Sequence, residues 1–139
     1  MSSISQNFSE LYEKATVLYQ NSAERSQDFP NLSSSEEHYL DILYSLNNPT
    51  LTTFSKKAQI SKPAATRIIH QFESKNYVTK VQSEQDGRVQ HLVLSDALKD
   101  HFGHNLVVFD RVFSDIISCL SEDEQNVLAR ILEKINQTI

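Results

Sequence analysis

The sequence predicts a mainly α-helical fold with one small two-stranded β-hairpin, and three observations lead to this prediction. Apolar residues recur at helical spacing in both terminal parts of the 139-residue chain. Two short helical patterns, each preceded by a capping hydroxyl residue, lie next to each other in the middle. Strand-forming residues then flank a polar turn. The length fits a single domain, residues 1–139.

The first predicted helix lies near the N-terminus, where apolar residues follow one another at helical spacing over five turns: Ile4, Phe8, Leu11, Tyr12, Ala15, Leu18 and Tyr19. A loop around Pro30 follows, because proline disfavours helix in the residue before it. The serines at 33–35 can cap a second helix, with acids in its first turn. Its apolar stripe contains Leu40, Leu43, Tyr44 and Leu46, and it ends at residues 47–49.

A helix-turn-helix is predicted next. Thr50 can cap a short third helix, and Ser61 can cap a fourth whose second residue is Pro63, where a missing N–H costs nothing. The inward positions of this fourth helix are Ala65, Ile68, Ile69 and Phe72. Its outward face contains no acidic residue and consists of Lys62, Pro63, Thr66, Arg67, His70 and Gln71. Such a face is typical of a helix that reads base edges in the DNA major groove.

The charge distribution supports this prediction. The chain has a net charge of −5, but residues 51–80 carry +5, which leaves −10 for the remainder. The basic residues of this segment are Lys56, Lys57, Lys62, Arg67, Lys75 and Lys80, against the single acid Glu73. One basic face on an otherwise acidic protein suits a phosphate-bearing partner, although a solvated lysine face is the simpler explanation of charge alone.

The hairpin is predicted from residues 77–82 and 89–94, with Gly87 and Arg88 near its tip. Helical spacing returns from Asp96 to Leu120. Ser121 and Glu124 then form a capping box that opens a last helix with the apolar residues Val127, Leu128, Ile131, Leu132 and Ile135.

This order of elements makes a winged helix-turn-helix with flanking helices, and it resembles the MarR family of bacterial transcription regulators over essentially the whole chain. Residues 54–61 occupy the place of the family's Leu-Ala-x-x-Leu-Gly-Val-Ser motif, and residues 65–73 match its recognition helix. Asp86-Gly-Arg88 matches the family's Asp-x-Arg in the wing, and residues 94–96 match its Leu-Thr-Glu. Three family glycines are replaced, by Gln59, Asn76 and Leu98.

The resemblance implies a homodimer that binds a pseudo-palindromic double-stranded DNA operator. Residues 33–95 would form the DNA-binding part, and residues 1–26 and 96–139 the helical dimerisation part. Ser61 would join the outward face of the fourth helix in contacting DNA. Arg88 would enter the minor groove, and Asp86 would orient the wing through a salt bridge. The implied function is that of a repressor released by an effector whose identity the sequence does not reveal.

The effector is open to several interpretations. A small molecule could lie between the dimerisation helices and the winged part, near Tyr12, Tyr19, Tyr39 and Leu43, although aromatic residues at helical spacing are more often core or interface. Zinc could be held by Glu37, His38, His101 and His104, as in the family's zinc-sensing branch. At least one of that branch's ligands is missing here, so we expect solvated histidines and no certain cofactor.

Other classes of function find little support. The chain has no HExxH or GxSxG motif and too few glycines for a phosphate-binding loop, so we expect no enzyme. No apolar run reaches the length of about 18 residues that spans a bilayer, so we expect a cytoplasmic protein without a membrane partner. Cys119 follows an apolar stripe and is expected to be buried and inert. A winged-helix module that binds protein instead of DNA remains the alternative.

Overall fold

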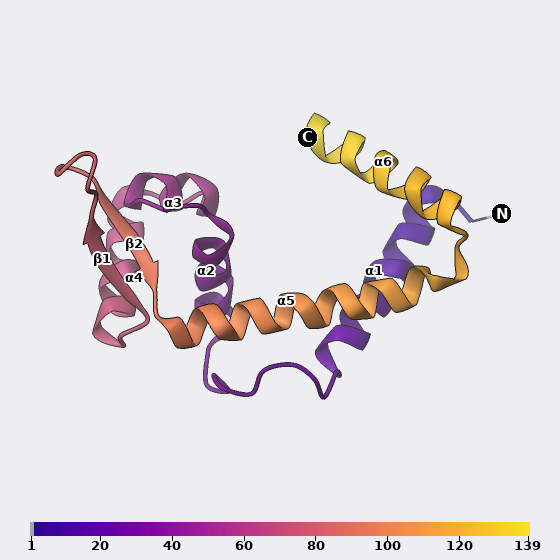
Figure 1. Cartoon of the computed structure of the whole chain (residues 1–139), viewed down its shortest axis with the longest axis horizontal. Coiled ribbons are helices and arrows are strands. Elements are labelled where there is room, and N and C mark those ends of the chain that lie inside the picture. Colours follow the sequence, from indigo (N-terminus) through magenta and orange to yellow (C-terminus); the bar gives the residue numbers. More distant parts are fainter. Residues whose placement is uncertain (1) are drawn as a thin grey trace. The chain divides into compact units, whose positions relative to one another are not determined.

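The computed structural model describes residues 2–139 and confirms the predicted fold class (Figure 1). The N-terminal helix and the helix-turn-helix region comprise α1 (Ile4–Gln20), α2 (Ser34–Ser45), α3 (Leu51–Ala58) and α4 (Lys62–Ser74). The hairpin and the C-terminal helices comprise β1 (Val78–Gln82), β2 (Gln90–Leu94), α5 (Asp96–Ile116), the short 3-10 helix η1 (Ile117–Cys119) and α6 (Glu122–Thr138).

The chain divides into two compact units. The winged-helix unit comprises Ser26–His104, and the helical unit comprises the chain up to Arg25 together with Asn105–Ile139. The winged-helix unit therefore contains the loop before α2 and the first turns of α5 in addition to the predicted residues 33–95.

Side-chain caps fix the starts of the helices. Ser33, Thr50, Ser61 and Ser121 cap α2, α3, α4 and α6, as their places in the sequence predict. In α6 the Ser121 hydroxyl accepts the N–H of Glu124 at 3.1 Å, and the Glu124 carboxylate accepts the N–H of Ser121 at 3.0 Å. α1 is capped in the same way by Ser3, a cap that was not predicted.

The ends of α3 and α4 share one backbone arrangement. Gln59 and Asn76 have φ angles of 57° and 60°, in the left-handed region. In each case the next residue donates its N–H to the carbonyl five residues earlier, from Ile60 to Ser55 at 3.1 Å and from Tyr77 to Phe72 at 2.9 Å. These are the bonds of a Schellman motif, in which glycine is the usual left-handed residue. The turn forms here although neither position is glycine.

The winged-helix unit has a continuous hydrophobic core. β1 and β2 pair antiparallel, with Val78 opposite Leu94 and Lys80 opposite Leu92. The inward side chains of the hairpin join those of the helices, and the core contains Leu40, Ile42, Leu43, Phe54, Ala65, Ile69, Phe72, Val78, Leu92, Leu94, Leu98 and Phe102. Leu98 is fully buried at the position where the family has glycine, so α5 begins against the core.

The helical unit buries far fewer apolar side chains than the winged-helix unit. Among its described residues, the buried apolar side chains are Ala15 and Val108. The Tyr19 ring packs edge-on against the Phe109 ring, with centroids 5.6 Å apart, and the side chains of Glu24 and Arg111 form an ion pair. Large apolar side chains remain exposed along α1, the second half of α5, α6 and the residue after it: Ile4, Phe8, Leu11, Tyr12, Val17, Leu18, Leu106, Val107, Phe109, Val127, Ile131, Leu132, Ile135 and Ile139.

Two expectations change at the C-terminal end of α5. The predicted helix to Leu120 ends at Ile116, and the 3-10 turn η1 and the extended residue Leu120 follow before Ser121 caps α6. Cys119 is exposed, so the prediction of a buried thiol is wrong for the single chain. Cys119 lies in this 3-10 turn, after α5 has ended, so the helical spacing from which its burial was predicted does not apply to it. Within residues 2–139, none of the helices is both long and apolar enough to cross a membrane.

Candidate nucleic-acid interface

The outward face of α4 carries the residues that the sequence predicts to meet DNA. Ser61, Lys62, Pro63, Arg67, His70 and Gln71 are exposed, and Thr66 is half-buried. The opposite face holds the buried Ala65, Ile69 and Phe72, so the core fixes which side of the helix meets solvent. The Ser61 hydroxyl accepts the N–H of Ala64 at 3.2 Å, which leaves the exposed first turn well ordered.

The cations of residues 51–80 fall into two groups. Lys75 and Lys80 are paired with acids, their ammonium groups lying 2.7 Å from Glu36 and 3.5 Å from Glu73. Lys56, Lys62 and Arg67 form no ion pair within the described part of the chain. These cations thus lie in the last turn of α3 and the first half of α4. Unpaired exposed cations are available for phosphate groups.

Sequence reasoning missed the contribution of α3 to this surface. Lys56 and Lys57 lie exposed in its last turn, and Lys57 donates a hydrogen bond to the Ser45 hydroxyl at 2.6 Å. Both lysines were counted in the basic segment but left out of the predicted DNA contacts. The apolar spacing of Leu51, Phe54 and Ala58 would have placed them on the outward side.

An ion pair ties the start of α2 to the end of the candidate recognition helix. Glu36 accepts the N–H of Ser33 in the α2 capping box and also the ammonium group of Lys75. The hydrogen bond from Lys75 and the bond from Ser33 lower the pKa of Glu36, and the same carboxylate raises the pKa of Lys75. Lys75 follows α4 directly, so this pair steadies the far end of that helix.

The wing tip is held by its own hydrogen bonds. The Ser83 hydroxyl accepts the N–H groups of Gln85 and Asp86 at 3.2 and 3.3 Å, and the Ser83 N–H donates to the Val89 carbonyl at 2.8 Å. Asp86 accepts the N–H of Arg88 at 3.1 Å, an Asx-type turn. In the view of Figure 1 the tip extends past α3 and α4 of the winged-helix unit. Arg88 is exposed.

The expected salt bridge of Asp86 is therefore replaced by a backbone contact. Within residues 2–139, Asp86 takes part in none of the ion pairs. Its carboxylate lies two residues before Arg88 in a tight turn, where the nearest donor is a backbone N–H instead of a charged side chain. Asp86 thus shapes the segment that carries Arg88.

The four residues of the zinc hypothesis have different surroundings. His101 is buried, with Nδ1 2.7 Å from the Ser26 hydroxyl and its ring edge-on to Phe29. His38 is exposed and its ring lies beside Tyr39, while His104 is exposed farther along α5. No group of three or more possible ligands that could hold a metal ion occurs in the part of the chain that the structure describes. The zinc site, with Glu37 as its carboxylate, stays a prediction.

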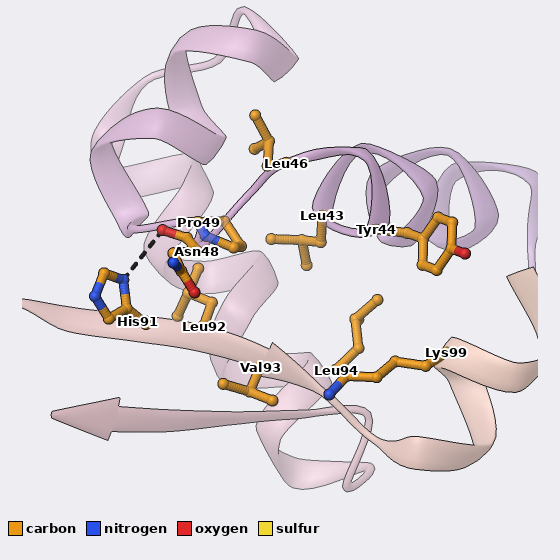
Figure 2. A pocket seen from close by; sticks show the side chains of 10 residues that line it. All are labelled: Leu43, Tyr44, Leu46, Asn48, Pro49, His91, Leu92, Val93, Leu94 and Lys99. Atoms are coloured by element: carbon orange, nitrogen blue, oxygen red, sulfur yellow. Dashed lines mark hydrogen bonds between the residues drawn. The ribbon is translucent and has the colours of Figure 1, made fainter. Parts of the chain in front are cut away.

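The residues predicted to line an effector pocket lie in both units and have different neighbours. Tyr12 is exposed in the helical unit, where Tyr19 packs against Phe109. In the winged-helix unit, Tyr39 packs edge-on against Phe54 with centroids 6.0 Å apart, and Leu43 is buried in the core. Leu43 also lines a cavity of about 300 Å³ between α2, β2 and the start of α5 (Figure 2).

Comparison with known proteins agrees with this geometry. Residues 32–89 match the model of the MarR family. YdgJ of Bacillus subtilis, described as an uncharacterized HTH-type transcriptional regulator, is 24% identical over 108 residues, which cover 78% of this chain and 66% of YdgJ.

Solved structures show the same fold. FabT of Streptococcus pneumoniae in complex with DNA is 26% identical, with a TM-score of 0.70 over 97% of this chain and 94% of FabT. MepR of S. aureus bound to ethidium bromide is 19% identical, with a TM-score of 0.69 over 99% of this chain and 96% of MepR.

Proposed function

Because the winged helix-turn-helix of this chain is that of the MarR family of transcriptional regulators, we propose that the protein binds a double-stranded DNA operator as a homodimer and represses transcription until an effector releases it. The operator is pseudo-palindromic, since each protomer presents one recognition helix to one half-site. Such a regulator works in the bacterial cytoplasm, where its DNA lies, and no catalytic residue is assigned to it.

The observation that carries the proposal is the outward face of α4. It holds no acidic side chain, and Lys62 and Arg67 are exposed and not paired with a carboxylate of the described residues. Lys56 and Lys57 at the end of α3 extend the same charge. The likeness to FabT, whose structure contains DNA, supports this assignment.

The residues have different roles in the proposal. Arg67 meets a base edge or an adjacent phosphate in the major groove, while Lys62 and the lysines of α3 meet phosphates. Ser61, Pro63, Thr66, His70 and Gln71 complete the surface against the groove. Arg88 enters the minor groove from the wing tip, where it responds to groove width and charge.

The proposal of a homodimer is based on the exposed apolar side chains of the helical unit. Among residues 2–139, every large exposed apolar side chain except Val81 belongs to that unit. Monomeric proteins rarely expose such a surface, and a second copy of the chain offers a complementary one. We therefore assign α1, α5 and α6 to the dimer interface.

Fluorescence anisotropy with DNA from upstream of the protein's own gene tests the proposal, with salt titrations for three variants. Arg67→Ala should cost about 1–3 kcal/mol and relax preference at one symmetric pair of positions if Arg67 reads a base. Arg88→Ala should weaken many sequences alike and lower the slope of log affinity against log salt by about one unit per half-site.

Arg130→Ala is the matched control, because it removes one exposed arginine from α6 instead of the winged-helix unit. It should bind DNA like the wild-type protein. Equal affinity of the wild type and of all three variants would contradict the assignment of α4 as the recognition helix. That result would favour the alternative of a winged-helix module that binds protein.

A further inference from the structure

The turn at the wing tip contains the one Asp-Gly step of the sequence, Asp86-Gly87. The other glycine, Gly103, follows Phe102, so no asparagine precedes a glycine either. Asp86, Gly87 and Arg88 are all exposed between β1 and β2 (Figure 1). An aspartate before glycine is prone to attack on its side-chain carboxyl by the next backbone nitrogen, because glycine has no β-carbon that hinders the approach.

The hydrogen bonds of this turn orient the Asp86 carboxyl group and the Gly87 nitrogen. The Val89 N–H donates to the Asp86 carbonyl at 3.0 Å, and the Arg88 N–H donates to the Asp86 carboxylate at 3.1 Å. Because the carboxylate bonds to the residue beyond Gly87, it is folded over the Gly87 peptide. Within residues 2–139, the Gly87 N–H donates no hydrogen bond. The two groups that can react therefore lie on the same side of the chain, and the nitrogen is available.

A step of related chemistry at the end of α1 has a different environment. Asn21 precedes Ser22 there, and asparagine undergoes the same attack with loss of ammonia. The Ser22 N–H donates to the Tyr19 carbonyl at 3.2 Å, so the attacking nitrogen is held by the helix end. Serine also has a β-carbon. This step is thus an internal comparison in which the backbone opposes the reaction.

We propose that Asp86-Gly87 is a site of spontaneous isomerisation to isoaspartate, which lowers operator affinity as the protein ages. The Gly87 nitrogen bonds to the side-chain carboxyl carbon of Asp86, and water leaves, formed from the amide hydrogen and the carboxyl O–H. The product is a cyclic succinimide. Water then adds to the former α-carbonyl carbon and the bond from that carbon to nitrogen breaks. One water is lost and one is taken up, so no other reactant is needed.

The isomerised wing tip has a different backbone. One extra methylene lies in the main chain between Asp86 and Gly87, and the former side-chain carboxyl becomes the peptide carbonyl. The carboxylate that accepted the Arg88 N–H is therefore removed from its place. The loss of such a bond should weaken operator binding about two- to tenfold. This effect on DNA binding rests on the proposed function, whereas the isomerisation does not.

Prolonged incubation at physiological temperature, followed by peptide mapping, tests the site. The isoaspartate content is measured with protein isoaspartate methyltransferase, which transfers one methyl group from S-adenosylmethionine to each freed α-carboxylate. Isoaspartate should accumulate at residue 86 and much less at residue 21. Gly87→Ala is the matched variant, because its β-carbon hinders the attack and would meet only the end of the flexible Gln82 side chain, at 3.3 Å. It should accumulate less isoaspartate than the wild type.

Fluorescence anisotropy with operator DNA then compares fresh, incubated and methyltransferase-treated protein. The methyl ester re-forms the succinimide with release of methanol, and hydrolysis returns part of it to aspartate, so treatment should restore affinity. Absence of isoaspartate at residue 86, or equal amounts in the wild type and Gly87→Ala, would overturn the site. Unchanged affinity of the isomerised protein would overturn its effect on the wing. Fresh protein without operator affinity would contradict the proposed function instead, while the peptide maps still decide the isomerisation.

Discussion

Single residues at the ends of α3 and α4 hold a backbone conformation that side chains disfavour. Gln59 and Asn76 both lie in the left-handed region, and each is followed by the long backbone bond that closes the helix end. Asparagine adopts this conformation more readily than glutamine, which has no short side chain to bond locally. Of the two turns, the one within the helix-turn-helix therefore stores more strain.

Gln59→Gly should raise the free energy of unfolding by about 1 kcal/mol, because glycine pays no steric penalty at a positive φ. Gln59→Ala keeps the β-carbon and should have nearly the stability of the wild type. Urea unfolding followed by circular dichroism measures both. A Gln59→Gly variant less stable than Gln59→Ala would show that the glutamine side chain contributes more than its backbone strain costs.

A second prediction concerns Glu36 and pH. The contacts of Glu36 with Lys75 and Ser33 lower its pKa in the folded state. Its ionised form thus stabilises the fold above the ordinary pKa of 4.5, and this contribution disappears as the pH falls through the lowered pKa. Glu36→Gln keeps an acceptor for the capping box, as Gln6 does in α1, but loses the ion pair.

The Glu36→Gln variant should be slightly less stable than the wild type at pH 7, since water screens this exposed pair. The difference in stability between the two proteins should disappear as the pH falls below 4.5, because the wild type then loses its own ion pair. Thermal melts of both proteins at several pH values measure this difference in stability. A stability difference that stays constant down to pH 3 would mean that the negative charge of Glu36 does not contribute to folding stability.

At the scale of elements, the wing differs most from what the sequence resemblance implied. Asp86 bonds to the backbone of Arg88 instead of a charged side chain, and Ser83 organises the same turn. The tip is thus shaped before any DNA is bound. Preorganisation of this kind lowers the entropy cost of placing Arg88 in a groove.

Substitutions of Asp86 distinguish its hydrogen bond to the Arg88 backbone from a salt bridge to a charged group. Asp86→Ala should weaken operator binding about two- to tenfold, the effect of one lost hydrogen bond, and should leave the salt slope nearly unchanged. Asp86→Asn retains an acceptor for the Arg88 N–H and should bind nearly as tightly as the wild type. If Asp86→Asn binds as weakly as Asp86→Ala, the negative charge matters and a salt bridge forms on DNA.

Local signals explain why most elements were predictable. The caps Ser33, Thr50, Ser61 and Ser121 bond within three residues of themselves, so their helices begin where the sequence indicates. The two faces of α4 likewise follow from spacing alone, and the resemblance to the MarR family is confirmed. The exposure of Cys119, the partner of Asp86 and the pairing of Lys75 with Glu36 depend on tertiary geometry, which no local pattern encodes.

At the scale of the whole molecule, the two units differ in what they bury. The winged-helix unit has a continuous core, whereas the helical unit leaves the apolar face of α6 exposed along its length. Ile131, with half of its surface exposed, lies in the middle of that face. The proposed dimer gives this face a partner.

Ile131→Glu should therefore yield monomers by light scattering, because a charge would be buried in the interface. Ala129→Glu adds the same charge on the other side of α6 and should remain dimeric. A dimeric Ile131→Glu protein would exclude α6 from the interface. Since each protomer of the proposed dimer contacts one half-site, the monomeric variant should also lose most of its operator affinity.

Because the helical unit buries few side chains, the amount of folded dimer in the proposal depends on the concentration of the chain. With little internal core, this unit would gain folding free energy by association in the proposed dimer, and its folded fraction would then fall on dilution. At low synthesis rates, the amount of paired protein grows with the square of the amount of chain. In the proposed dimer, operator occupancy at low concentration would therefore rise more than twofold when synthesis of the regulator doubles.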